Sequence, residues 1–473
     1  MKGSKMRFSL FSKWAALAVV LAALAISLPA SAAPYQLSGN GGAGGVNQGG
    51  SAGVNAGASA NNPGGATNAS GGIHPQATSH NPYQLTVDSR AALVPPGQTK
   101  GHPLVTMHRA LHPNFSTEAV LHSFAGPDGS SPQGAIGQLL NGALFGTAFS
   151  GGASSAGVDW SFNTRSAAFS VVHTFKGSDG MNPVNIDWVG VGVTQFGGAK
   201  NMGTVYAVNL AGHVTILHSF VGTDGAQPVG NPMVFVDGCI YGTTWKGGAN
   251  SQGVVYQICG SRFRTLHSFN ENVEGGEPLA GLSVAINGFS LSPYLFGTTT
   301  SAGPNGGGTI YRLTPNTGAV TTLYGFGGPV DGNGDTPSAE LITDFSGNLY
   351  GTNNGGGLGA GTVFRYSLTS GVLTALYKFG ADGSDSANPA APLAFDAYGN
   401  LYGTATTGGS PGEGGIVFVL PAAGGYMQIW SFNAVTNDGS LPAGPVLVGI
   451  DGNLYGTTQS GGVNSLGTIW RMQ

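Results

Sequence analysis

Charge is scarce in this chain, and the scarcity limits which partners the protein can have. Asp, Glu, Lys and Arg make up 8% of the 473 residues, against about 25% in an average soluble domain. From Ala119 to the C-terminus, 19 Asp and Glu outnumber 10 Lys and Arg, so the net charge of this part is −9. An acidic surface repels nucleic acid and anionic membranes, and we expect neither as a partner.

Long apolar runs are also missing, apart from one near the N-terminus. Several basic residues precede an apolar run from Trp14 to Leu28, and the small residues Ala30, Ser31 and Ala32 follow it. This run is shorter than the roughly 20 residues needed to span a bilayer, and the pattern is that of a secretory signal peptide. We therefore predict that residues 1–32 are removed on export to the periplasm or the extracellular space. The mature protein is expected to have no membrane span.

Large side chains are nearly absent from residues 33–72, which are mostly Gly, Ala, Asn and Ser. A segment of this composition buries too little surface to offset its ordering entropy, so we expect a flexible linker. Residues 73–117 have a more mixed composition and are interpreted as an irregular connecting segment. The folded domain is then expected over residues 118–473.

Three short phrases recur through this domain at intervals of 45 to 57 residues. Tyr-Gly-Thr or Phe-Gly-Thr begins at Phe145, Tyr241, Phe296, Tyr350, Tyr402 and Tyr455, with a degenerate copy at Val191. LHSF or a variant begins at Leu121, Val172, Leu217, Leu266, Leu323, Leu376 and Ile429. GTVY or a variant begins at Gly157, Gly203, Gly253, Gly308, Gly361, Gly415 and Gly467. Each phrase therefore has seven copies.

Each unit divides into four short strands, which in the third unit are NPMVFVD, CIYGTT, GVVYQIC and RTLHSF. Gly, Asn and Asp between them supply turn positions, and the Gly of Tyr-Gly-Thr indicates a close approach of backbone. Four antiparallel strands in about 50 residues match a propeller blade, whereas the coils of a linear β-solenoid, the alternative, are usually shorter.

The repeats start with a fourth strand and end with a third, so pairing of these two strands would close a ring without free edges. We predict an all-β fold. It is a seven-bladed β-propeller of four-stranded antiparallel blades, closed by pairing of its N-terminal and C-terminal strands.

Cysteine is restricted to Cys239 and Cys259. Export takes a protein to an oxidising compartment. The midpoint of the two positions, Ala249, lies in the loop between the second and third strands of the third unit, so symmetrical pairing places the cysteines opposite each other. Cross-strand Cβ atoms lie about 4.5–5.5 Å apart, and a small adjustment brings them within disulfide reach. We predict a disulfide.

The phrases resemble the GloVer repeat of secreted bacterial proteins. The resemblance rests on Tyr-Gly-Thr-Thr, a Gly-Gly loop, GTVY and the LHSF phrase followed by GxDGxxP, which reads GPDGSSP from Gly126 and GTDGAQP from Gly222. It covers Leu121 to the C-terminus. It implies an exported bacterial protein and brings no established activity with it.

Histidine recurs in the LHSF phrase, as His122, His173, His218 and His267. The other units have Tyr324, Tyr377 and Trp430 at this position. A ring of metal ligands is one interpretation, but residues one blade apart are too far from each other to share a ligand shell of about 2 Å. We expect a strand position that accepts a semi-polar aromatic side chain, and no metal site.

Aspartate recurs in the GxDG turn, as Asp128, Asp179, Asp224, Asp382 and Asp438, with Asp331 or Asp335 less regular. This turn joins one blade to the next, and alternating strand direction places it on the same face of the ring as the Gly-Gly loops. In such a turn Asp commonly accepts local backbone N–H bonds. The alternative is a ligand-binding face for sugars, for which Ca²⁺ stays open as a cofactor.

Two functions of different kinds remain open. The first is a non-catalytic binding or interaction scaffold, expected as a monomer, whose Gly/Asp-rich loop face recognises a glycan or a cell-surface partner. The second is an extracellular polysaccharide-degrading hydrolase or lyase. No catalytic motif stands out, which favours the first, although the fold alone decides nothing. Unique polar side chains pointing into the central channel would distinguish them, and Glu271, Glu274 and Glu277 are the clearest departure from the repeat.

Overall fold

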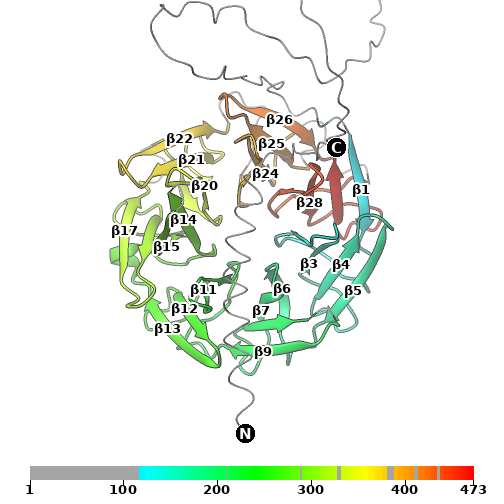
Figure 1. The fold of residues 1–473 in the computed structure, drawn as a ribbon, viewed down its shortest axis with the longest axis horizontal. Coiled ribbons are helices and arrows are strands. Elements are labelled where there is room, and N and C mark those ends of the chain that lie inside the picture. The colour runs from blue at the N-terminus through cyan, green and yellow to red at the C-terminus, as the bar shows by residue number, and fades with distance from the viewer. Residues whose placement is uncertain are drawn as a thin grey trace, which may run out of the picture. The chain divides into compact units, whose positions relative to one another are not determined.

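The computed structural model describes residues 115, 117–209, 211–287, 290–327, 332–380, 388–409, 414–433 and 437–473. These residues form seven antiparallel sheets arranged in a ring, which confirms the predicted seven-bladed β-propeller (Figure 1). The predicted signal peptide, the linker and nearly all of the connecting segment lie outside the described residues. In the described part of the chain, no helix is both long and apolar enough to cross a membrane.

Each blade is a meander whose first strand is innermost and whose fourth strand is outermost. Blade 1 contains β2 (Gly137–Gln138), β3 (Leu144–Ala148), β4 (Val158–Asn163) and β5 (Ala168–Thr174). Blade 2 contains β6 (Met181–Ile186), β7 (Val191–Phe196), β8 (Thr204–Val208) and β9 (Val214–Ser219). Blade 3 contains β10 (Met233–Val234), β11 (Ile240–Thr244), β12 (Val254–Cys259) and β13 (Arg262–Ser268).

The short helix α2 (Glu271–Glu274) precedes blade 4, which contains β14 (Ser283–Asn287), β15 (Ser290–Thr299), β16 (Thr309–Leu313) and β17 (Val320–Gly325). Blade 5 has its first strand in two pieces, β18 (Asp335–Pro337) and β19 (Ile342–Thr343), followed by β20 (Asn348–Gly355), β21 (Thr362–Ser367) and β22 (Leu373–Lys378). Blade 6 contains β23 (Ala394–Phe395), β24 (Leu401–Ala405), β25 (Ile416–Leu420) and β26 (Met427–Ser431).

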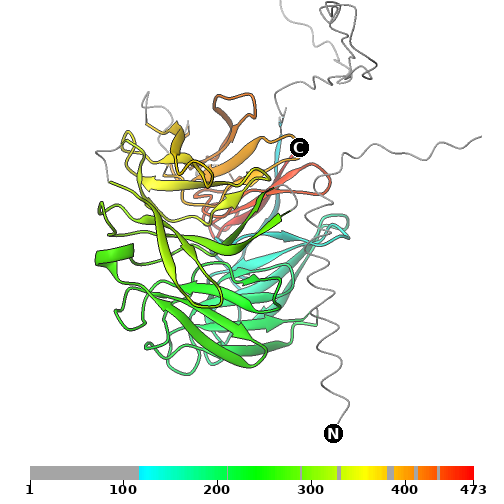
Figure 2. The ribbon, with the colours of Figure 1, turned by 60° about the vertical axis from the view of Figure 1, so that its left-hand side comes forward.

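Blade 7 closes the ring with strands from both ends of the domain. Its first three strands are β27 (Leu447–Val448), β28 (Leu454–Thr458) and β29 (Thr468–Met472), and β1 (Glu118–Ser123) is the fourth. β1 pairs with β29 in antiparallel register, so that Val120 lies opposite Trp470 and His122 opposite Ile469. Figure 1 and Figure 2 show β1, in cyan, beside the red strands at the C-terminal end of the chain. The predicted closure is therefore confirmed.

The apolar core lies between neighbouring blades, because alternate residues of a strand face opposite sides of its sheet. One cluster joins Tyr241 and Phe269 of blade 3 to Leu295 and Tyr311 of blade 4. The Phe that ends the LHSF phrase is fully buried in all seven copies: Phe124, Phe175, Phe220, Phe269, Phe326, Phe379 and Phe432. This Phe therefore occupies the same buried packing position in each of the seven units.

The Gly of Tyr-Gly-Thr is required by an aromatic ring, not by approaching backbone as the sequence suggested. Gly242 pairs with Tyr256 across β11 and β12, and a Cβ at Gly242 would lie 2.3 Å from the Tyr256 hydroxyl oxygen. Gly456 lies under Trp470 in the same way, where a Cβ would come within 2.2 Å of the indole ring. The Tyr-Gly-Thr and GTVY phrases of the repeat are thus two halves of one cross-strand contact.

Cys239 and Cys259 form a disulfide across blade 3. The register of β11 and β12 places Ile240 opposite Ile258, so the two cysteines come next to each other at the end of the hairpin, with Cα atoms 4.4 Å apart. The symmetry argument from their spacing predicted this arrangement.

Candidate functional site

The Asp of the GxDG turn is bonded both to its own turn and to the recurring histidine. Asp224 Oδ1 accepts a hydrogen bond from the Val221 backbone N–H at 2.8 Å, and its Oδ2 lies 2.9 Å from His218 Nε2. The same arrangement joins Asp128 to His122 at 2.9 Å and Asp179 to His173 at 3.0 Å. Both carboxylate oxygens therefore have a structural role in each of these three turns.

The histidine of this pair is also packed as an aromatic ring. His218 stacks on Phe263 with ring centroids 3.6 Å apart and meets Phe220 edge-on at 4.9 Å. These contacts correspond to the semi-polar aromatic position expected from the sequence. Within the described ranges, no three His, Cys, Asp or Glu side chains come together as a metal site would require.

The remaining acidic candidates follow the turn less closely. Both oxygens of Asp438 lie 3.3 Å from the Asn433 backbone nitrogen. In blade 4, Glu274 replaces the Asp, and its Oε1 lies 2.5 Å from His267 Nε2. Asp335 begins β18 and accepts a hydrogen bond from Thr336 Oγ1 at 3.2 Å. Asp382 and Asp331 lie outside the described residues.

The acidic turns and the Gly-Gly loops touch each other on one side of the ring, which we call the loop face. Gly248 N–H donates to the Gly222 carbonyl at 2.9 Å, and Ala226 and Lys246 exchange backbone hydrogen bonds at 2.8 and 3.0 Å. Gly247 has φ +80°, and a Cβ there would lie 2.5 Å from the Gly222 carbonyl oxygen. The Gly-Gly pair is thus needed for close contact between loop and turn.

The loop face departs from the repeat between blades 3 and 4, at a group that we call the blade 3–4 cluster: Trp245, Lys246, Gln252, Glu271 and Glu277. Lys246 forms an ion pair with Glu277, and its Nζ lies 4.9 Å from the centre of the Trp245 ring. Trp245 Nε1 lies 3.4 Å from Glu277 Oε2. Gln252 Nε2 donates to Glu271 at 2.8 Å, whereas its buried Oε1 has no partner in the described structure. Sequence reasoning found the glutamates and missed the other three members.

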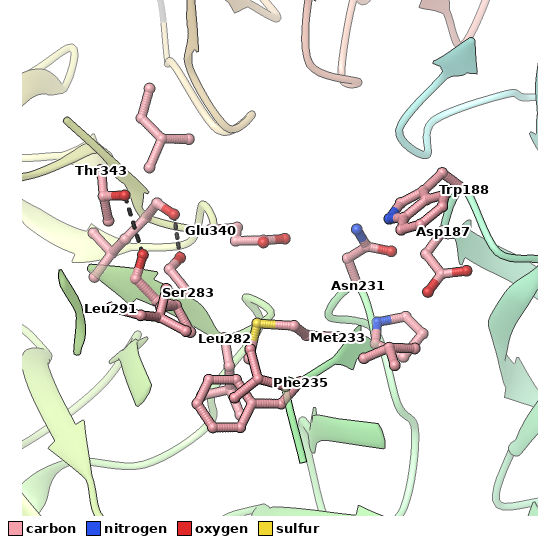
Figure 3. A pocket seen from close by; sticks show the side chains of 16 residues that line it. Asp187, Trp188, Asn231, Met233, Phe235, Leu282, Ser283, Leu291, Glu340 and Thr343 are labelled. Atoms are coloured by element: carbon pink, nitrogen blue, oxygen red, sulfur yellow. Dashed lines mark hydrogen bonds between the residues drawn. The ribbon is translucent and has the colours of Figure 1, made fainter. Parts of the chain in front are cut away.

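A second irregularity lies in the central channel, where a cavity of about 340 Å³ opens between the innermost strands of blades 3, 4 and 5. Its walls include Met233, Leu282 and Leu341, with Trp188 of blade 2 at one side. Figure 3 shows Glu340 and Asn231 pointing toward one another from opposite walls. The cavity is mostly apolar with few polar groups, as ligand pockets commonly are.

Glu340 is a half-buried carboxylate in the gap between β18 and β19. Among the described residues, none donates a hydrogen bond to it, and burial raises its pKa to about 8. A Cβ at Gly281 would lie 2.8 Å from Glu340 Oε2, so the glycine leaves the room that the carboxylate occupies. Across the cavity, the buried Oδ1 of Asn231 is also without a partner in the described structure.

The sequence contains a signal for Glu340 that our reading of it missed. The third residue after the Pro that follows each acidic turn is Ala135, Ile186, Asn231, Gly281, Glu340, Pro392 and Pro445 in blades 1 to 7. Only one of the seven is charged. Glu340 is thus the one charged residue at this repeat position, and aligning the units on this Pro would have revealed it.

Asp187 is the other ionisable side chain that lines the cavity. It is buried, and its Oδ1 accepts hydrogen bonds from the backbone N–H groups of Val191 at 2.7 Å and Val189 at 3.0 Å. Burial raises its pKa to about 7 in spite of these bonds. Asp187 therefore holds the turn between β6 and β7 and adds negative charge beside the cavity.

A closed ring of four-stranded sheets around a channel defines the protein as a seven-bladed β-propeller. The family model described as the Gloeobacter/Verrucomicrobia repeat matches residues 187–410, from the turn after β6 in blade 2 to the loop after β24. This part of the propeller therefore matches the repeat that the resemblance of the phrases indicated. No curated protein matches the sequence.

Solved structures resemble the chain only distantly. TolB from Acinetobacter baumannii is 14% identical with a TM-score of 0.39, over 62% of this chain and 64% of TolB. The extracellular domain of a putative one component system from B. thetaiotaomicron is 11% identical with a TM-score of 0.47, over 75% of this chain and 40% of that chain. In both cases the chain spans less than two thirds of the matched structure's length.

Proposed function

We propose that the protein is an exported, non-catalytic binding propeller that recognises carbohydrate through its loop face. The observation that supports this proposal is the blade 3–4 cluster, where an aromatic ring, an ion pair and a carboxamide lie together on neighbouring loops. At the position of Lys246, blade 1 has Ser150 and blade 7 has Ser460. Carbohydrates are bound by such groups, because a sugar offers both an apolar ring face and many hydroxyl groups.

The cluster offers each kind of contact on neighbouring loops. The half-buried Trp245 ring supplies apolar surface, and the Lys246–Glu277 pair supplies a charged donor and acceptor. Gln252 and Glu271, joined by a hydrogen bond at 2.8 Å, add a carboxamide and a second carboxylate. The acidic turns of Asp128, Asp179 and Asp224 hold the surrounding loops in place, and their carboxylates are the candidates for a Ca²⁺-assisted contact.

A glycan array with the mature protein, residues 33–473, tests the proposal. The array is probed with the unchanged protein and with Trp245→Ala, each with and without Ca²⁺. We expect binding to a defined group of glycans that Trp245→Ala weakens by roughly tenfold or more. The matched control is Leu358→Ala, which removes an exposed apolar side chain from the Gly-Gly loop of blade 5 on the same face. If no glycan is bound, or if both variants lose binding equally, the proposed site is wrong.

The same protein and glycans also test the second candidate function, a polysaccharide-degrading hydrolase or lyase. Each glycan that the protein binds is incubated with it, and new reducing ends and new unsaturated sugars are measured. A scaffold leaves the glycan intact. Release of either product that depends on the protein would replace the binding proposal by the enzymatic one.

A further inference from the structure

The face opposite the loop face carries at least one exposed large apolar side chain in every blade. These side chains lie in or beside the turn that joins the first strand of each blade to the second: Leu140, Trp188, Val236, Leu291, Phe345, Tyr398 and Ile450. Their exposed fractions range from 38% for Leu291 to 95% for Leu140. Single exposed apolar residues are ordinary on protein surfaces. A set that recurs at one structural position around the channel is different, and we call it the apolar ring.

The same turns are acidic. Asp187, Asp237, Asp344, Asp396 and Asp451 stand in five of the seven turns, and none of the seven contains Lys or Arg. The Asp344 and Asp451 carboxyls accept hydrogen bonds from their turns, which hold the pKa of each below its usual value, so both are ionised at neutral pH. The surface around the channel mouth is therefore apolar and negatively charged.

The apolar ring continues into the channel cavity. Trp188, Val236 and Leu291 belong both to the ring and to the cavity wall. Glu340 lies deeper, next to Leu341 and across from Asn231 (Figure 3). A ligand on the ring would thus have direct access to a carboxylate that lacks a hydrogen-bond donor in the described structure.

We propose that this face binds a short peptide segment in which apolar side chains flank a Lys or Arg, and that the basic side chain enters the cavity to pair with Glu340. The apolar side chains pack on the ring and remove its surface from water. The cation supplies the donors that Glu340 lacks, and a charge-assisted hydrogen bond is stronger than a neutral one. The Asp residues in the turns of this face attract such a segment and repel an anionic membrane surface, which would otherwise suit an apolar ring.

The affinity should depend on pH, because Glu340 has to lose its proton before it can pair with a cation. Its pKa is about 8 in the free protein, so the carboxyl is mainly neutral at pH 6 and ionised at pH 9. The only other ionisable group on the cavity wall is Asp187, which gains negative charge in the same direction. Affinity is expected to rise by up to about tenfold per pH unit below pH 8 and to level off above it.

The experiment uses blocked pentapeptides with Lys, Arg, norleucine or Glu in the centre and Leu, Phe or Ala at the flanking positions. Binding to residues 33–473 is measured by calorimetry at pH 6, 7, 8 and 9. We expect Lys or Arg peptides with Leu or Phe flanks to bind, and their norleucine and Glu counterparts to bind at least roughly tenfold more weakly. Trp188→Ser should weaken all of these peptides, because it removes apolar surface from the ring.

Glu340→Gln is the decisive variant, since it keeps the shape of the side chain and removes its charge. It should abolish both the preference for Lys over norleucine and the rise in affinity with pH, while Val463→Ser, an exposed apolar position on the loop face, leaves both unchanged. The proposal is overturned if no basic peptide binds, or if Glu340→Gln retains the preference. It does not depend on carbohydrate binding at the loop face, since the two sites share no residue.

Discussion

His218 Nε2 lies 2.9 Å from Asp224 Oδ2, and the histidine ring also stacks on Phe263 at 3.6 Å. His218 lies near the end of β9, the outermost strand of blade 2, and it thus connects this strand to the turn that begins blade 3. The pair recurs at His122 with Asp128 and at His173 with Asp179. The recurring His and Asp could suggest metal ligands, but in these three copies they pair with each other and connect successive blades.

The contribution of the His218–Asp224 pair to stability can be measured by a double-mutant cycle. His218→Phe keeps an aromatic ring and removes the hydrogen bond, whereas Asp224→Ala also leaves the Val221 N–H without its acceptor. We expect Asp224→Ala to lower the free energy of unfolding by about 1–3 kcal/mol and the two residues to be coupled by about 1 kcal/mol. Urea unfolding of the single and double variants gives both values. Strict additivity of the two changes would mean that the pair does not stabilise the joint.

Ring closure predicts very different effects for two deletions. Deleting the chain from Gly467 onward removes β29, whose Ile469, Trp470 and Met472 side chains are fully buried. The surfaces that these side chains cover would then be exposed to water. At about 1.5–3 kcal/mol for each side chain, the loss should be roughly 5 kcal/mol or more. Deletion of residues 33–72 should leave the melting temperature nearly unchanged. Thermal melting of both variants checks the contrast, and similar melting temperatures for the two would contradict a sealed ring.

The aromatic contact of the repeat predicts the effect of one added methyl group. Gly456→Ala places a Cβ within 2.2 Å of the Trp470 ring and should destabilise the protein by about 1–3 kcal/mol through overpacking. Gly325→Ala is the matched control, because Gly325 is also a strand residue and its Cβ would meet nothing closer than 3.4 Å. Chemical unfolding of both variants should show a clear loss for the first only. Equal stability of the two would show that the indole ring moves aside freely.

The disulfide predicts a dependence of stability on redox conditions. Cys239 and Cys259 are separated by 20 positions, and a closed loop of about this length is worth roughly 3 kcal/mol in the chain-entropy model. The variant with both cysteines changed to Ser should unfold at lower urea concentration and lose its response to reductant. Labelling of the unfolded, unreduced protein should find no free thiol. Two labelled thiols per chain would rule the bond out.

Glu340 predicts a loss of stability as the pH rises. Burial raises its pKa from the ordinary value of 4.5 to about 8, so the folded protein holds a proton that the unfolded chain has released. The contribution of Glu340 is therefore most favourable below about pH 4.5, and it is lost progressively up to about pH 8. Glu340→Gln should lessen this decline and be the more stable protein at pH 8.5, by at least about 1 kcal/mol. Unfolding at pH 5, 7 and 8.5 measures the trend, and parallel pH profiles for the two proteins would contradict it.

The architecture could be predicted from the sequence because each blade repeats the same local physics. Three features recur at nearly constant intervals: a Gly opposite an aromatic ring, a buried Phe at the end of the outermost strand, and Gly-rich turns. Their positions within each repeat show where the strands begin and end. The displaced start and end of the repeats define the closure, as the pairing of Val120 with Trp470 confirms. The spacing of Cys239 and Cys259 about one hairpin loop places them opposite each other for the same reason.

Only the tertiary structure decided which side chains meet outside these regular positions. Asn231, Gly281 and Glu340 are about 50 residues apart in sequence and come together because the curvature of the ring brings the inner edges of three blades to one cavity. The apolar ring likewise exists only when seven separate turns are placed around one channel. A repeat specifies the blade that each unit forms. The contacts across the channel depend on residues that differ between units, and their meeting is determined by the closed ring.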